Sequence, residues 1–150
     1  MSTDNLKVYD AEEIVVGRLG TKVAKDALLG NDVVIVNVEK AIITGNHRSL
    51  ISAYKEKLNI RTSSNPTHGP FHDRRPDKMV RRIIRGMLPW PKPRGKAAYK
   101  RIKVFIGVPN QYADVEKIVL EDARYRSLKQ RYMTVKDLSY ELGWRSPEVS

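Results

Sequence analysis

The chain has 150 residues, of which 41% are apolar and 30% charged, and it contains no cysteine. This is the size of one ordinary domain, with enough hydrophobic side chains for a core and too many for a wholly disordered protein. The lack of cysteine excludes disulfides and thiolate metal sites. Because Met1–Leu6 is polar and no apolar run reaches the length of a membrane span, we expect a soluble cytoplasmic protein with no membrane partner.

The net charge of +11 is concentrated in residues 61–103, which we call the basic segment. It holds thirteen Lys and Arg residues against two Asp, whereas residues 1–60 and 104–150 each sum to zero. Solvated faces normally mix charges of both signs, and a field so concentrated attracts polyanions over about 8 Å at physiological salt. The charge distribution therefore predicts nucleic-acid binding.

The first third of the chain predicts a βαβ unit. Leu6–Tyr9 alternates weakly, as a short strand does, and Val16–Leu29 has apolar residues at three- and four-residue spacing, as an amphipathic helix does. Gly30 is expected to end that helix. Asp32–Val38 contains a β-branched run typical of a strand covered on both faces. We expect two parallel strands joined by a right-handed crossover.

The next stretch leads into the basic segment. Ala41–Thr44 fits either a short strand or a single helical turn, and His47–Leu58 has helical spacing. Residues 61–75 have almost no apolar side chains and cannot offset the entropy cost of packing into a core. We expect an exposed loop there, ordered by its ligand.

Pro76–Leu88 predicts a helix with two different faces. Pro76 suits a first turn, where its missing N–H costs nothing. At about 100° per residue, the cations fall within an arc of roughly 100°, opposite the apolar side chains. Those cations are Lys78, Arg81, Arg82 and Arg85. Gly86 would cost about 1 kcal/mol inside the helix, so it indicates either a close backbone approach or an early end. One face should pack and the other should bind.

The remaining elements are shorter. Three prolines oppose regular structure around Trp90, after which Gly95–Ile102 has a helical pattern. Val104–Val108 is typical of a strand, and Val115–Leu120 fits a strand or an extended tail. Thr134–Leu142 predicts a final helix with Thr134 as its N-cap.

The pattern favours RNA over DNA, because an Arg-rich loop suits folded RNA and no DNA-reading module is recognisable. Phe71, Trp90 and Tyr99 are interleaved with the cations. Trp90 either stacks on a base or anchors the loop to the core. Arg side chains can clamp phosphates bidentately. The expected RNA-binding residues are Arg61, His68, His72, Arg74, Arg75, Lys78, Arg81, Arg82, Arg85, Trp90, Lys92, Arg94, Lys96, Lys100, Arg101 and Lys103.

One alternative is an RNA-processing enzyme that uses His68, His72 and Asp73, since imidazole and carboxylate groups serve hydrolytic and metal sites. The segment offers no further strong ligand at metal spacing, and the surrounding guanidinium groups disfavour a bound cation. We therefore expect no metal, no cofactor, no catalytic residue and no small-molecule substrate.

Four strings carry a family resemblance: VVGRLGTKVAK at Val15–Lys25, VVIVNVEKAIITG at Val33–Gly45, MVRRIIRGMLP at Met79–Pro89 and KRIKVFIGVP at Lys100–Pro109. Together they resemble the large-ribosomal-subunit protein thirteen family over about residues 6–112. The HGPFHDRRP loop and the extension after Asp114 resemble the archaeal and eukaryotic branch. The acidic N-terminus favours the archaeal side.

The resemblance implies a single α/β domain over residues 1–150, with a three-layer α/β/α core and a four-stranded, mainly parallel sheet. The core would span about 6–112, with the basic segment binding RNA and a C-terminal extension at 113–150. It also implies a structural protein of the ribosome, not an enzyme, that binds large-subunit ribosomal RNA beside neighbouring ribosomal proteins. An extra-ribosomal RNA-binding regulator would use the same surface and remains a second alternative.

Overall fold

The computed structural model describes residues 5–126 and 129–147. Its strands and helices, in chain order, are β1 (Leu6–Asp10), α1 (Val16–Leu28), β2 (Asp32–Val36), β3 (Ile42–Thr44), α2 (His47–Asn59), α3 (Pro76–Arg85), α4 (Pro93–Arg101), β4 (Ile102–Val104), β5 (Tyr132–Thr134) and α5 (Val135–Glu141). Within the described ranges, no helix is long and apolar enough to cross a membrane.

The main sheet has the order β1-β2-β4, and both pairings are parallel. Leu6 lies opposite Asp32, and Val33 lies opposite Ile102. The expected βαβ unit is therefore confirmed as β1-α1-β2. The expected four-stranded sheet is found only in part, because this sheet has three strands in the described chain and β3 pairs separately with β5, antiparallel.

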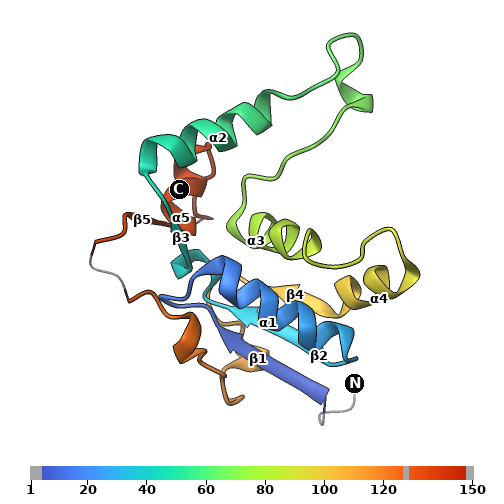
Figure 1. The fold of residues 1–150 in the computed structure, drawn as a ribbon, viewed down its shortest axis with the longest axis vertical. Helices are drawn as coiled ribbons and strands as arrows, with labels where there is room; N and C mark the ends of the chain where they lie inside the picture. The colour runs from blue at the N-terminus through green and yellow to red at the C-terminus, as the bar shows by residue number, and fades with distance from the viewer. Residues whose placement is uncertain (1–4, 127–128, 148–150) are drawn as a thin grey trace.

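The two faces of the sheet are covered differently. Val33 and Ile35 belong to the main core cluster with α1, α3 and α5, whereas Val34 and Val36 pack with Tyr112 on the other face. That second face is covered by the chain around the 3-10 turn Asn110–Tyr112 (η4), and Figure 1 shows this segment on the side of β1 away from α1. In the described residues, the predicted α/β/α layering thus has its α-helical layer on one face only.

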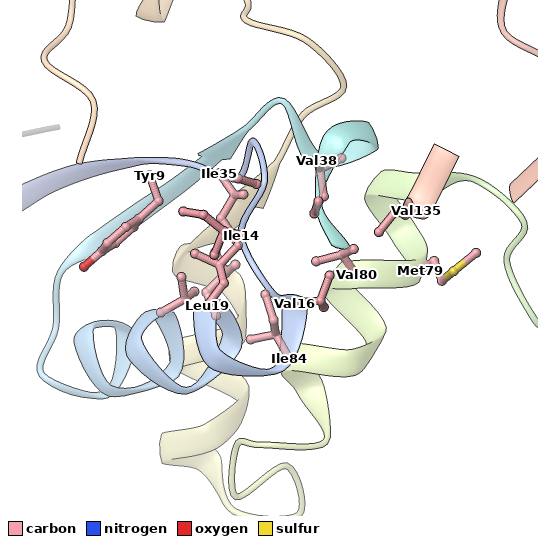
Figure 2. Close-up of a cluster of buried hydrophobic side chains, with 14 of the residues drawn as sticks. Tyr9, Ile14, Val16, Leu19, Ile35, Val38, Met79, Val80, Ile84 and Val135 are labelled. Atoms are coloured by element: carbon pink, nitrogen blue, oxygen red, sulfur yellow. The ribbon is translucent and has the colours of Figure 1, made fainter. Parts of the chain in front are cut away.

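The main core joins α1, α3 and α5. Figure 2 shows Val16 and Leu19 of α1 beside Val80 and Ile84 of α3, with Val135 of α5 close by. All five side chains are 0–3% exposed, and each such burial contributes roughly 1.5–3 kcal/mol. The predicted apolar face of α3 is therefore confirmed, and it fixes the orientation of the cationic face.

Helix ends follow local chemistry. Gly30 has a φ of 100° and follows Leu29, the C-cap of α1, so it ends the helix as predicted. α3 ends at Arg85 with Gly86 as its C-cap, so Gly86 marks an early end of the helix. In α5, the Thr134 hydroxyl accepts a hydrogen bond from the Asp137 backbone N–H at 3.1 Å, which confirms the predicted N-cap.

Two strand assignments differ from the sequence-based expectation, and the structure decides a third that the sequence left open. β4 covers Ile102–Val104, not Val104–Val108, because Ile102 fits both the helical and the strand pattern and lies in register with Val33. Of the two alternatives for Ala41–Thr44, the short strand is confirmed, as β3 at Ile42–Thr44. Its partner β5 was not predicted, since three residues in a polar stretch leave little periodic signal.

The Val115–Leu120 segment runs along the outer edge of β1. Ile118 bridges to Tyr9, and its backbone exchanges hydrogen bonds with Val8 and Asp10 at 2.7 and 3.1 Å. It forms a single bridge instead of a regular strand. The expected extended tail is the better description of this part of the C-terminal extension.

A polar cluster ties β1 to α1. Lys7 Nζ lies 2.7 Å from Asp26 Oδ1, and the Tyr9 hydroxyl donates a hydrogen bond to Asp26 Oδ2. Burial alone would raise the pKa of Asp26, but the hydrogen bonds from Lys7 and Tyr9 outweigh it and hold this pKa below its ordinary value. Burial, reinforced by the hydrogen bond to Asp26, raises the pKa of Tyr9.

Candidate nucleic-acid interface

The basic segment covers one continuous path through the molecule. It leaves the end of α2, forms a loop that projects beyond that helix, returns to α3, and reaches β4 through α4 (Figure 1). Most of the predicted RNA-binding residues along it are exposed: Arg61, His68, Arg74, Arg75, Lys78, Arg82, Lys92, Arg94, Lys96, Lys100 and Lys103. His72, Arg81, Arg85, Trp90 and Arg101 are half-buried.

The loop at residues 61–75 is exposed, as predicted, and its tip makes contacts of its own. Asn65 Oδ1 accepts a hydrogen bond from the Thr67 backbone N–H at 3.2 Å at the start of the 3-10 turn Pro66–His68 (η3). A Cβ added to Gly69 would lie 2.9 Å from the Thr62 backbone nitrogen, so the two arms of the tip approach closely. These contacts join the two arms of the loop at its tip.

The cationic face of α3 divides into two parts. Lys78 and Arg82 are exposed, whereas Arg81 and Arg85 are half-buried on the side toward α4. The two residues of each pair are four positions apart, so they are neighbours on the helix surface. The sequence predicted that all four cations would be free to bind. In the structure, two of them, Arg81 and Arg85, contact neighbouring side chains instead.

Two aromatic rings hold that second pair, in an arrangement we call the aromatic clamp: Arg81, Arg85, Trp90 and Tyr99. The Arg81 guanidinium lies 4.3 Å from the Tyr99 ring centroid and donates a hydrogen bond to the Tyr99 carbonyl oxygen at 3.3 Å. The Arg85 guanidinium lies 4.8 Å from the Trp90 ring centroid. The two rings meet edge to face at 5.0 Å and 83°. Of the two roles considered for Trp90, the geometry supports the anchor.

The turn between α3 and α4 is tightly closed. Lys92 N–H donates to the Pro89 carbonyl at 3.0 Å, and a Cβ on Gly95 would lie 2.0 Å from that same oxygen. Only glycine fits this approach. Pro93 forms the first turn of α4, so it starts the helix two residues earlier than the sequence predicted.

Arg101 has a partner within the fold. Its Nη1 donates a hydrogen bond at 3.2 Å to the carbonyl of Ala27, in the last turn of α1. A guanidinium at the C-terminal end of a helix also interacts favourably with the helix dipole. Arg101 therefore joins α4 to α1, and it offers less of its charge to an outside ligand than the exposed cations do.

The His68, His72 and Asp73 cluster is divided by the structure. His72 and Asp73 line a hollow of about 350 Å³ together with Arg82, and His68 is not among its lining residues. Lys78 Nζ lies 3.8 Å from Asp73 Oδ1. Across residues 5–126 and 129–147, no three His, Cys, Asp or Glu side chains are grouped closely enough to hold a metal.

Few carboxylates neutralise the surface. Within the part of the chain that the structure describes, the ion pairs of the basic segment are Arg75 with Asp77 at 3.2 Å and Lys78 with Asp73 at 3.8 Å. Both include exposed cations, and such pairs contribute little to stability. The other exposed cations of the segment form a field available to a polyanion.

A family model described as Ribosomal protein L13 matches residues 4–111. The chain belongs to the ribosomal protein L13 family. The match covers the main sheet, α1 to α4 and the whole basic segment, and it ends before the C-terminal extension.

Archaeal members of the L13 family align with almost the whole chain. A large ribosomal subunit protein uL13 of Archaeoglobus fulgidus is 39% identical over 144 residues, which are 95% of this chain and 90% of the relative. The uL13 of Methanocaldococcus jannaschii is 42% identical over 139 residues, covering 92% of this chain and 98% of the relative. The uL13 of Methanococcus maripaludis is 45% identical over 139 residues, covering 91% and 96%.

Sequence reasoning did not identify two residues that shape the site of this L13 family member. Tyr99 was noted as an aromatic among cations, but its contact with Arg81 depends on how α4 packs against α3. Gly95 was assigned only as a helix residue, because its close approach to the Pro89 backbone depends on how the preceding turn folds.

Proposed function

We propose that this chain is a structural constituent of the large ribosomal subunit that binds large-subunit ribosomal RNA through the basic segment. It stabilises that RNA during assembly and in the mature particle, and so supports translation without catalysing a reaction. The observation that carries the proposal is the concentration of exposed cations in residues 61–103, in a chain of the ribosomal protein L13 family.

The aromatic clamp supports this role physically. An Arg side chain loses rotamer entropy when it is fixed on a phosphate, and one already held by a ring loses less. Arg81 and Arg85 are held in this way, whereas Lys78 and Arg82 are exposed and can adjust to the RNA, Lys78 by leaving its exposed ion pair with Asp73 at 3.8 Å. α3 would thus present two prepositioned and two adaptable cations, on a helix whose other face is buried in the core.

The C-terminal extension, residues 113–150, would serve a different purpose. Its described part adds β5 to β3 and α5 to the main core, and it carries balanced charge. A balanced surface adds little to polyanion attraction. We assign its exposed surface to contacts with RNA or with neighbouring large-subunit proteins, while α5 completes the core that residues 6–112 form in large part.

Binding of purified protein to large-subunit ribosomal RNA should depend steeply on salt. If roughly eight to ten phosphates are neutralised, log K should fall against log salt with a slope of about −6 to −9. Sedimentation of the protein with large ribosomal subunits from a lysate gives a second measurement. A salt-independent affinity, or absence from the subunit fraction, would refute the proposal.

A charge-matched pair of variants tests the location of the site. Changing Arg74, Arg82 and Lys100 to Gln should weaken binding and make the slope shallower by about 2–3. The control changes three exposed lysines elsewhere to Gln: Lys22 in α1, Lys55 in α2 and Lys136 in α5. Equal losses in both variants would show that overall charge, not the basic segment, drives binding.

The RNA-processing alternative makes the opposite prediction. Sustained cleavage of labelled RNA in the presence of divalent metal, abolished by His72→Ala, would overturn a purely structural role. An extra-ribosomal regulator would instead co-purify with a free RNA and not with ribosomal subunits.

A further inference from the structure

The structure separates three aromatic residues that look equivalent in the sequence. Trp90 and Tyr99 pack against each other and against two arginines in the aromatic clamp. Phe71 is 71% exposed. Within the described residues, its ring makes no aromatic–aromatic contact and no cation–π contact. The basic segment thus contains one aromatic ring that the fold itself does not use.

The outward position of Phe71 is set by its neighbours. The arm that follows η3 has no regular secondary structure, and its neighbouring residues Phe71 and His72 differ in burial. His72, the next residue, is half-buried, and its Nε2 atom is enclosed beside the hollow that this residue lines with Asp73. With His72 turned inward and the tip closed at Gly69, Phe71 faces solvent.

The surroundings of Phe71 favour a nucleobase over a protein partner. Protein interfaces place such rings in an apolar, charge-depleted centre. Phe71 is instead followed by His72, Asp73, Arg74 and Arg75, and both arginines are exposed. Cations that track a phosphate backbone beside a free aromatic face are the arrangement that holds unpaired bases.

We propose that Phe71 is a base-stacking residue that binds an unpaired nucleobase of the RNA, while the neighbouring arginines hold the adjoining phosphates. This inference rests on the proposed function. It adds a contact with a base face to a surface otherwise described by phosphate contacts, and it gives the loop a preference for single-stranded or bulged RNA.

Four single variants test the stacking, each measured for binding to purified large-subunit ribosomal RNA. Phe71→Ala should weaken binding about 5- to 150-fold, the range that one lost base stack produces. Phe71→Leu should lose nearly as much, because it keeps apolar area but not the aromatic face, whereas Phe71→Trp should bind like the wild type. The matched control is Ile60→Ala, an apolar side chain at the other end of the loop that is 58% exposed; it should bind like the wild type.

Two further readouts separate stacking from charge and from folding. The salt slope of Phe71→Ala should equal that of the wild type, because no cation is removed. Its thermal unfolding should also be unchanged, since the ring is exposed. In Phe71→Trp, RNA should quench an added fluorescence component that is absent from the wild type.

The outcomes are distinct from those of the proposed function. Wild-type protein that binds RNA in a salt-dependent manner, together with a Phe71→Ala variant of equal affinity, would overturn the stacking role alone. Wild-type affinity in Phe71→Leu, a loss in Phe71→Trp as large as in Phe71→Ala, or an equal loss in Ile60→Ala would overturn it too. Failure of the wild type to bind would refute the proposed function itself.

Discussion

Gly95 is the residue whose substitution the structure constrains most sharply. A Cβ at this position would lie 2.0 Å from the Pro89 carbonyl oxygen, 2.3 Å from the Pro89 carbonyl carbon and 2.9 Å from the Trp90 nitrogen. Real Cβ contacts stay beyond 3.0 Å, so α4 and the preceding turn would have to separate by about 1 Å. All three atoms belong to the backbone, which cannot move aside as a flexible side chain would.

The magnitude follows from two opposing effects of Gly95→Ala. Overpacking of this kind costs roughly 1–3 kcal/mol or more, while Ala gains up to about 1 kcal/mol over Gly in a helix. We expect a net loss of roughly 1–2 kcal/mol or more in the free energy of unfolding. For a chain of this size, that lowers Tm by roughly 2–8 °C.

The assay is urea and thermal unfolding of Gly95→Ala beside Gly17→Ala. Gly17 lies in α1, and its added Cβ would meet nothing within 4 Å. This control therefore has the helix-propensity gain without the clash and should be neutral or slightly stabilised. A Gly95→Ala protein as stable as the Gly17→Ala control would refute the reasoning.

Three other expectations concern single side chains. Asp26→Asn should be less stable than the wild type near neutral pH. Because the pKa of Asp26 is held below its ordinary 3.8, the carboxylate stabilises the fold above that pH. This contribution is lost as the pH falls through the pKa of the folded state. Chemical unfolding between about pH 6 and pH 2 should therefore show a smaller acid dependence in the variant, and equal slopes would contradict this. Thr134→Ala removes the hydroxyl that accepts the Asp137 N–H and should cost about 0.5–2 kcal/mol of unfolding free energy, measured against Thr134→Ser as the cap-retaining control. Trp90→Leu removes the ring beneath Arg85 and should weaken RNA binding several-fold without changing charge, whereas Trp90→Phe should retain most of the affinity; equal binding by all three proteins would show that the ring does not position the arginine.

The helices of the core could be predicted because their signal is local. α1, α2 and α5 begin and end within about a residue of the expected positions, since apolar spacing, Gly30 and the Thr134 cap act over one or two turns. The short strands were harder to predict. β5 has three residues, and it exists because β3 lies beside it.

In the candidate interface, too, some features could be predicted from the sequence and others could not. The sequence by itself determined where the charge lies, because net charge over residues 61–103 is a property of composition and survives any packing. It also determined that α3 has an apolar and a cationic face, because helical geometry maps spacing onto direction. Neither property specifies which cations are free.

Only the tertiary structure decided that question. Tyr99 of α4 lies against Arg81, Trp90 of the turn between α3 and α4 lies against Arg85, and Arg101 reaches the end of α1. The same arrangement uses Trp90 as an anchor, whereas Phe71 lies outside it, in the loop, and is exposed. The physical reason is that side-chain contacts between elements depend on their relative placement in space, which no local pattern of residues encodes.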